Sequence, residues 1–156
     1  MSELVQQSNT LDIGDISGLS PTEIVQRAEN EMLKLPQVEI PTRHYFIPGS
    51  YAREITIPKG TLLTGHTHLL PQINIISKGD ITVLTENGPV RVTAPATIVS
   101  PAGSKRIGYA HEETVWTTIL GVPETDVEEI ERKYLVNDAL RLGETGPVVP
   151  PQKEET

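Results

Sequence analysis

Two histidines, one residue apart, are the residues of this 156-residue chain whose types and spacing suggest chemistry. In GHTHLLPQINIISKG, which covers residues 65–79, His66 and His68 are followed by Gln72. Alternate residues of a β-strand face the same side, so the two imidazoles would enter one space. Neutral imidazoles bind Fe, Mn, Ni and Zn, usually with a carboxylate and often with a third imidazole. The stretch predicts a metal site of His66, His68 and Gln72, and the alternative is a hydrogen-bonded interior pair of imidazoles without a metal.

Arg106 is the second candidate residue. A guanidinium is always cationic and is not a metal ligand, so beside two imidazoles and an amide it would bind an anion such as a carboxylate or phosphate. The alternative is a surface arginine, or one paired with an acid such as Glu54 or Glu112. His44 and His111 are expected to be surface or hydrogen-bonded, half-buried residues, with His111 facing away from the side of Arg106.

Composition and charge exclude several function classes. The chain has no cysteine, which rules out a disulfide framework, a thiolate metal site and a cysteine nucleophile. The net charge of −8 divides into −4 over residues 1–35, +1 over 36–122 and −5 over 123–156. Nucleic-acid surfaces need clustered Lys and Arg, and a membrane-spanning helix needs roughly 20 apolar residues, so we expect neither partner. The N-terminus also lacks the pattern of a secretion signal.

Short β-type runs fill the middle of the chain, and Pro- or Gly-containing turns separate them. Asn87-Gly88 is a strong hairpin signal between two of these runs. So many short strands without a helix among them favour a sandwich or a closed barrel. The expected strands are 43–47, 51–57, 61–68, 72–77, 80–85, 89–93, 96–100, 104–110 and 114–120.

Two amphipathic helices flank the β-rich region. Ser20 and Glu23 form a capping box that predicts the first helix, and Thr125 is the expected N-cap of the second. In the second helix Val127, Ile130 and Tyr134 share one face. The segments expected are a flexible arm (1–19), a helix (20–35), a barrel (36–122), a helix (123–136) and a Pro-rich acidic tail that is disordered or an extended arm (137–156).

The alternation along residues 64–74 predicts which side chains meet. Even-numbered residues from Thr64 to Leu70 would share one face of a strand, and Gln72 and Asn74 have the same parity on the next. In a small barrel one such face lines the interior. His66, His68 and Gln72 are therefore expected to converge inside the barrel.

The spacing of these residues resembles the motifs of the cupin superfamily. Gly60, His66, His68, Gln72 and Gly79 reproduce the first motif, with Gln72 at its glutamate position. This resemblance implies an all-β, cupin-type double-stranded β-helix, or jelly-roll barrel, with one N-terminal and one C-terminal helix and polar arms.

The second cupin motif is matched in part. Pro101 and Gly103 agree with it, whereas Pro95 replaces its leading glycine, Arg106 its histidine and Ala110 its asparagine. Exchanging an acid for an amide and an imidazole for a guanidinium opposes the binding of a divalent cation. We therefore expect no cofactor, the alternative being a first-row metal such as Fe, Mn, Ni or Zn.

A longer stretch, over residues 28–135, is similar to small cupin proteins of tailed bacteriophages, on segments such as LPQVEIPTRHYF and SPAGSKRIGYAHEETVWTTILG. The resemblance implies a non-enzymatic, virion-associated structural or assembly protein. It would form homo-oligomers through barrel and arms, contact other phage virion proteins, and reside in the host cytoplasm or the virion. No catalytic residue is assigned on this hypothesis.

Two alternatives use the barrel interior instead. One is a metal-dependent enzyme of the dioxygenase or isomerase type, and the other is a small-anion-binding cupin. Both would use the pocket of His66, His68, Gln72 and Arg106.

Overall fold

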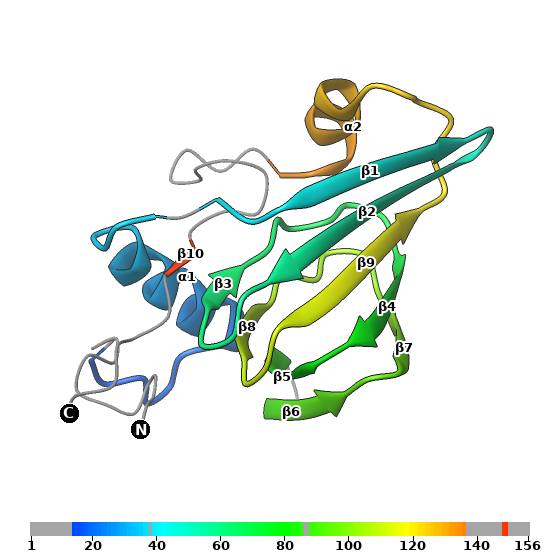
Figure 1. The fold of residues 1–156 in the computed structure, drawn as a ribbon. Helices are drawn as coiled ribbons and strands as arrows, with labels where there is room; N and C mark the ends of the chain where they lie inside the picture. The colour runs from blue at the N-terminus through cyan, green and yellow to red at the C-terminus, as the bar shows by residue number, and fades with distance from the viewer. Residues whose placement is uncertain (1–13, 38, 86–87, 137–147, 150–156) are drawn as a thin grey trace.

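The computed structural model describes residues 14–37, 39–85, 88–136 and 148–149, which form two antiparallel sheets and two helices (Figure 1). One sheet has the order β1-β2-β9-β4-β7 and the other the order β10-β3-β8-β5-β6. The two sheets face each other as a jelly roll, so the expected all-β barrel is confirmed. The strands are β1 (Thr42–Ile47), β2 (Ser50–Ile57), β3 (Leu62–Thr64), β4 (Gln72–Lys78), β5 (Asp80–Thr85), β6 (Gly88–Thr93), β7 (Ala96–Ser100), β8 (Ile107–Ala110), β9 (Thr114–Leu120) and β10 (Val148–Val149).

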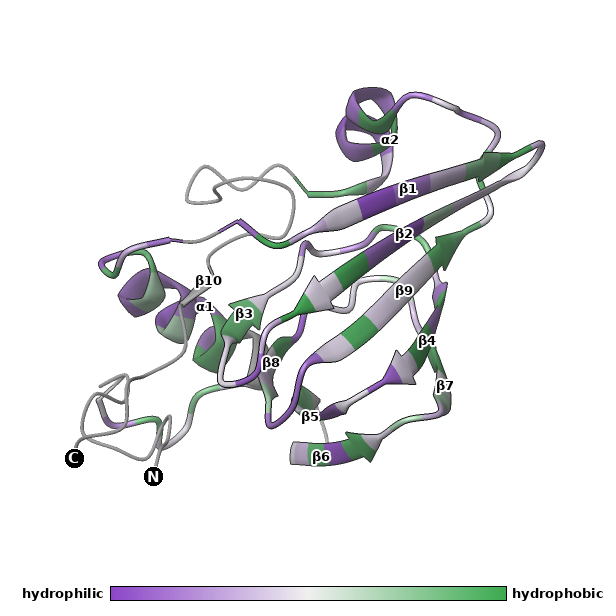
Figure 2. Ribbon diagram, in the orientation of Figure 1, coloured by the Kyte–Doolittle hydropathy of each residue, from purple (hydrophilic) through white to green (hydrophobic). Residues whose placement is uncertain are grey.

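Alternating side chains divide each strand into an inner and an outer face. Hydrophobic and hydrophilic residues alternate along β2, for example (Figure 2), where Ile55 and Ile57 are buried in the core. On the facing sheet Leu63, Ile81 and Val83 belong to the same core cluster. The core therefore lies between the sheets, as the β-type periodicity predicts.

The helix α1 (Pro21–Met32) begins as the sequence predicts. Ser20 Oγ accepts a hydrogen bond from the Glu23 N–H at 3.2 Å, and the Glu23 carboxylate accepts one from the Ser20 N–H at 2.8 Å. This capping box satisfies two N–H groups that the helix itself leaves unpaired.

The helix α2 (Val127–Tyr134) differs from the prediction at its start. Asp126, not Thr125, is the N-cap, and no side-chain cap bond forms there. Ile130 is fully buried, and Val127 and Tyr134 pack against the same cluster, which confirms the predicted apolar face.

Two strands are shorter than expected. Residues 61–68 contain only β3, and residues 104–110 contain only β8. The physical reason is a tertiary contact: Thr64 is fully buried and donates to Glu29 of α1, whereas Leu63 lines the barrel interior. Thr64 therefore faces away from the interior, so the predicted shared face of Thr64 and His66 is wrong.

The predicted hairpin at Asn87-Gly88 is confirmed by strand pairing, since Thr85 of β5 lies opposite Gly88 of β6. The predicted arm and tail fall mainly on residues 1–13, 137–147 and 150–156, outside the described residues. Of the tail, Val148 and Val149 form β10, which pairs with β3. No helix in the described part of the chain is long and apolar enough to span a membrane.

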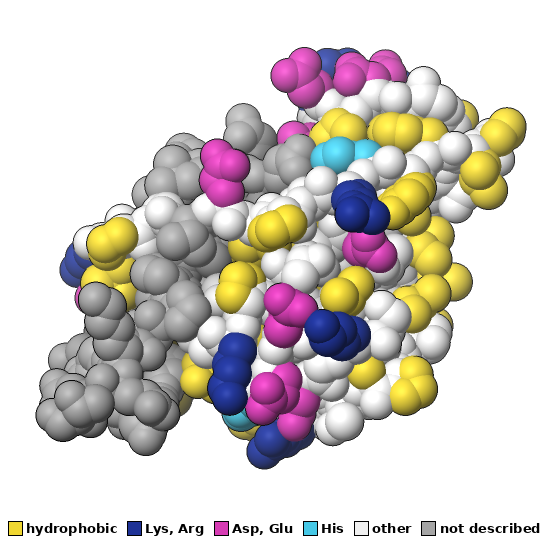
Figure 3. Space-filling model, in the orientation of Figure 1, with side chains coloured by type: hydrophobic (Ala, Val, Ile, Leu, Met, Phe, Trp, Pro, Cys, Tyr) yellow, Lys and Arg dark blue, Asp and Glu magenta, His cyan; other side chains and the backbone are white. Residues whose placement is uncertain are grey.

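A row of apolar residues crosses the outer face of the first sheet. Strand register places Tyr45, Ala52, Ile119, Ile73 and Val99 directly opposite one another on β1, β2, β9, β4 and β7. Val99 is 73% exposed. Hydrophobic side chains gather on the right-hand side of the surface in Figure 3. We call these five residues the outer apolar row.

Gly79 joins β4 to β5 in a conformation that favours glycine. Its φ is +108°, and an added Cβ would lie 2.5 Å from Glu113 O and 2.6 Å from Thr114 Cα. We expect Gly79→Ala to lower the free energy of unfolding by at least about 2 kcal/mol, measured by urea denaturation. The control is Gly121→Ala, because a Cβ there would come no nearer than 3.9 Å to Gly49 O. Equal losses in the two variants would contradict this account.

Candidate functional site

A cavity of about 120 Å³ lies inside the barrel and brings the four predicted residues together. His66, His68, Gln72 and Arg106 all line it. Their convergence confirms the placement that the motif spacing predicts. It does so although His66, His68 and Arg106 follow or precede the strands β3 and β8 instead of lying on them.

Strand register orders the cavity wall into layers. In the first sheet, Arg53, Thr118 and Asn74 lie opposite one another and form a polar layer. Ile55, Trp116 and Ile76 form the next layer toward the far end of the barrel. In the facing sheet, Leu63, Gly108 and Val83 align. The cavity thus has a polar middle and an apolar floor.

Asn74 organises the polar layer. Its Oδ1 accepts hydrogen bonds from Trp116 Nε1 at 3.0 Å and from Thr118 Oγ1 at 2.9 Å. Its Nδ2 donates to Ser100 Oγ at 2.9 Å, and the Arg106 guanidinium donates to the same oxygen. This chain of hydrogen bonds fixes the side chain of Arg106 at the cavity wall.

The expected alternative for Arg106, a pair with Glu54 or Glu112, is wrong. Glu112 instead lies 3.7 Å from Lys59, and Glu54 accepts a 3.5 Å hydrogen bond from Tyr45. Arg106 Nε is buried and has no hydrogen-bond partner among the described residues. A buried donor without a hydrogen-bond partner, on a residue that lines the cavity, is a candidate contact for a ligand.

Gln72 presents an acceptor to the same space. Its Nε2 donates to Ser104 Oγ at 3.3 Å, and Ser104 in turn donates to Pro101 O at 2.9 Å. Gln72 Oε1 is buried and accepts no hydrogen bond from the described residues. Ser104, in the loop that precedes Arg106, therefore holds the orientation of the Gln72 amide.

The segment with the histidines is held from both sides. On one side Gly65 N–H donates to Arg106 O at 3.1 Å and Gly103 N–H donates to His68 O at 2.7 Å. On the other side Leu69 N–H donates to Tyr134 O at 2.8 Å, at the end of α2. Because Ile130, Glu131 and Leu135 also line the cavity, α2 and the residues after it cover its mouth.

A buried ion pair outside the barrel links α1 to this site. Glu29 is fully buried; its carboxylate accepts from Thr64 Oγ1 at 2.7 Å and pairs with Lys105 Nζ at 2.7 Å. Thr64 comes just before the histidine segment, and Lys105 just before Arg106. This contact was not predicted, although an acid within the apolar stripe of Val25, Ala28 and Met32 is a signal for it in the sequence.

A resident divalent metal, which the cupin resemblance implies, does not fit this donor set. Two imidazoles and an amide are present, but no group of three His, Cys, Asp or Glu side chains that could hold a metal occurs in the described ranges. The guanidinium groups of Arg53 and Arg106 line the same cavity. Two guanidinium groups against the one carboxylate of the described lining, Glu131, leave a net positive charge at the wall, which opposes a divalent cation inside it.

Arg53 is a lining residue that was not predicted from the sequence. It lies on β2 with the same parity as Ile55 and Ile57, whose burial marks the inner face. The alternation of REITI was therefore a usable signal.

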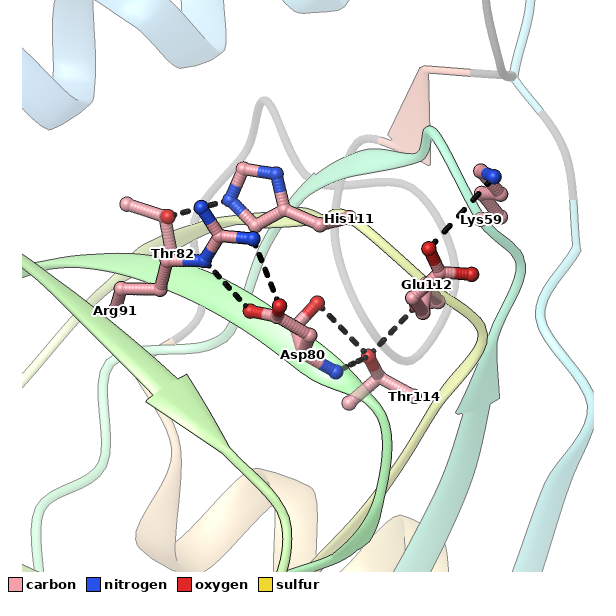
Figure 4. Close-up of polar contacts among 7 residues, drawn as sticks. All are labelled: Lys59, Asp80, Thr82, Arg91, His111, Glu112 and Thr114. Atoms are coloured by element: carbon pink, nitrogen blue, oxygen red, sulfur yellow. Dashed lines mark hydrogen bonds and ion pairs between the residues drawn. The ribbon is translucent and has the colours of Figure 1, made fainter.

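His44 and His111 do not line the cavity. His44 Nδ1 lies 2.7 Å from the Tyr51 hydroxyl. His111 Nε2 lies 2.6 Å from Thr82 Oγ1 on the outer side of the second sheet (Figure 4). Both are half-buried and hydrogen-bonded, as expected.

An ion pair lies beside His111 (Figure 4). Arg91 donates to both carboxylate oxygens of Asp80, at 2.9 and 2.8 Å, and these hydrogen bonds hold the pKa of Asp80 below its usual value. Burial lowers the pKa of His111, and the charge of Arg91 lowers it further. His111 is thus held neutral at a pH where an unfolded histidine is protonated.

Stability is expected to fall with acidification in a window set by His111. Because the unfolded chain takes up the proton more readily, the contribution of His111 is complete above about pH 6.5 and is lost below it, toward the lowered pKa. Urea unfolding at about pH 7.5 and 5.5 measures the loss. His111→Gln should lose less over this interval, and an identical loss in both proteins would contradict the assignment.

Comparison with known proteins supports the fold. An ectoine synthase from P. lautus matches with a TM-score of 0.50 and 13% identity, over 64% of this chain and 78% of that chain. A cupin-2 domain containing protein from Shewanella frigidimarina matches with a TM-score of 0.46 and 15% identity, over 60% of this chain and 91% of that one. No protein-family model and no curated protein matches the sequence.

An acetylacetone dioxygenase from Acinetobacter johnsonii also matches, with a TM-score of 0.44 and 18% identity. The match covers 52% of this chain and 58% of the dioxygenase, so the chain spans little more than half of that enzyme's length. At these identities the comparisons show the fold alone, which is the jelly-roll barrel of cupins.

Proposed function

We propose that this protein binds a small organic anion in the barrel cavity through Arg106. The observation that carries the proposal is the setting of that side chain. Ser100 fixes the guanidinium at the cavity wall, and its Nε is buried without a hydrogen-bond partner among the described residues. Charge-assisted hydrogen bonds from a fixed guanidinium to a carboxylate are among the strongest in proteins.

The other lining residues support an anion in preference to a cation. Arg53 adds a second guanidinium, and His66 and His68 can donate N–H groups. Glu131, at the mouth, is the carboxylate among the described lining residues. A cavity of about 120 Å³ suits a molecule of a few carbon atoms.

Calorimetric titration with acetate, benzoate and phosphate tests the proposal. We expect at least one of these anions to bind, and Arg106→Gln to weaken binding at least about tenfold. Arg91→Gln is the matched control, because Arg91 lies on the outer side of the second sheet and bonds Asp80. Absence of binding by all three anions, or an unchanged affinity in Arg106→Gln, would overturn the proposal.

The outer apolar row favours a second proposal, in which two copies of the chain pair through this sheet face. Exposed apolar rows of this kind mark interaction surfaces. Arg43 and Glu54 lie opposite each other on the same face, one row away. Each of these charges offsets the other within one chain, so this part of the face has no net charge that would repel an identical face, and a second copy is the fitting occupant.

Light scattering of the variant Val99→Glu tests the pairing. The charge should convert the dimer to monomer, whereas Val90→Glu on β6 of the other sheet should leave the mass unchanged. A monomeric parent protein, or a dimer that survives Val99→Glu, would contradict the pairing.

The phage resemblance suggests a more specific version of this second proposal, in which the paired chains have an assembly role in a virion. Mass spectrometry of purified phage particles would test whether the protein is present in them.

A further inference from the structure

The layering of the cavity wall selects among small anions. The polar layer of Arg53, Asn74 and Thr118 lies next to Arg106, which Ser100 and Asn74 connect to it. An anionic group would therefore sit at this level. The residues above and below that level then determine which other groups the ligand can carry.

The floor below the polar layer is apolar. Ile55 and Trp116 lie one layer deeper in the first sheet, and Leu63 and Val83 face them from the second. The indole N–H of Trp116 is already donated to Asn74. A charged or hydroxylated group placed here would lose its hydration without gaining a partner, while an apolar group would gain from burial.

The mouth above the polar layer also disfavours a second negative charge. Glu131 lines the cavity there, together with the apolar residues Ile130 and Leu135. A ligand with two carboxylates that cannot place both in the polar layer, beside Arg53 and Arg106, would have to put one against Glu131 or on the floor. Both positions are unfavourable.

The size of the cavity limits the apolar group. Its volume of about 120 Å³ is slightly below that of an apolar protein cavity of ~150 Å³ that accommodates benzene. Because the same volume must also hold the carboxylate, a branched chain of about four carbon atoms fits, and a single compact ring is the upper limit.

We propose that the ligand of this cavity is a monocarboxylate with one compact apolar group, held with its carboxylate at Arg106 and the apolar group on the floor. The inference rests on the proposed function and specifies its ligand class. Isovalerate and benzoate represent the class as probes. Acetate lacks the apolar group, succinate has a second charge, and isoamyl alcohol lacks the carboxylate.

Calorimetric titration of the full chain with these five compounds tests the ligand class. We expect isovalerate or benzoate to bind at least about tenfold more tightly than acetate and succinate, because each buried methylene adds to the binding free energy. Equal binding of acetate, succinate and isovalerate would overturn the ligand class and leave the proposed anion site standing. Binding of isoamyl alcohol as tight as that of isovalerate would overturn both.

Two variants test the orientation of the ligand. Gly108→Ala adds a methyl group to the floor, 3.1 Å from the flexible end of Ile81, and should weaken benzoate more than acetate. Glu131→Gln should reduce the preference for isovalerate over succinate at the mouth. If Gly108→Ala weakened both acids equally, or Glu131→Gln left the preference unchanged, the proposed orientation would be wrong.

Discussion

The double variant Gln72→Glu, Arg106→His is expected to bind Zn²⁺ or Ni²⁺ at least about 100-fold more tightly than the parent protein. The two substitutions add a carboxylate and a third imidazole to a cavity that already contains His66 and His68. They also remove one positive charge and add one negative charge at the same place. Both the donor count and the local charge then favour a divalent cation.

The backbone around these positions makes the variant a fair test. Gly65 N–H bonds Arg106 O, so residue 106 is adjacent to the histidine segment, and Gln72 begins the strand β4 that follows it. Neither substitution changes a glycine or proline of the turns. The expected metal site therefore forms without a change of the backbone around residues 72 and 106.

Metal content and calorimetric affinity should be measured on the parent, on both single variants and on the triple variant that adds His66→Ala. Each single variant should bind less tightly than the double variant, and the triple variant should lose the site. A surface pair of the same substitutions, Gln26→Glu with Arg132→His, controls for net charge. Stoichiometric metal in the parent protein, lost on His66→Ala, would show that the unmodified donor set is sufficient and would contradict our account.

The second large effect concerns the buried carboxylate of α1. Glu29→Gln is expected to lower the free energy of unfolding by about 3–5 kcal/mol, because it removes the buried carboxylate that pairs with Lys105 Nζ and accepts a hydrogen bond from Thr64. The side chain of Lys105 is 12% exposed and that of Glu29 is fully buried, so water compensates little. Urea denaturation at constant pH measures the loss.

The same helix offers a matched control. Glu31 and Lys34 are also 2.7 Å apart, but their side chains are 32% and 70% exposed. Exposed pairs contribute about 0–1 kcal/mol, so Glu31→Gln should have little effect. Adding Lys105→Met to Glu29→Gln should recover part of the stability, because it removes the buried charge whose carboxylate on α1 is gone. A similar loss in Glu29→Gln and Glu31→Gln would mean that burial does not govern this pair.

Local signals in the sequence were sufficient for much of the fold. The capping box of Ser20 and Glu23 forms as predicted, and Thr85 pairs with Gly88 across the predicted hairpin. The ends of β3 and β8 were not predictable in this way. They depend on Thr64 and Lys105 turning outward to Glu29, about 35 and 76 residues away along the chain.

The candidate site, like the fold, was predicted in part from the sequence. The motif spacing predicted that His66, His68, Gln72 and Arg106 lie together, because turns of fixed length determine where the residues on either side of them are placed. An acid partner for Arg106, one of the alternatives considered, does not occur, and its partner Ser100 was not predicted, since a hydroxyl has no charge pattern that marks it in a sequence. The layers of polar and apolar residues could not be predicted, because they depend on the register between paired strands, and the sequence of one strand does not determine that register.

The backbone hydrogen bonds at the mouth of the cavity also affect the rate of ligand exchange. Residues 67–69 lie between the loop at residues 103–104 and the segment that follows α2, with Val136 N–H donating to Thr67 O at 3.0 Å. Local fraying of this edge would widen the mouth, so it would raise the rate at which a bound molecule leaves. A variant that weakens these backbone bonds should therefore shorten the residence time of a ligand, measured by NMR exchange.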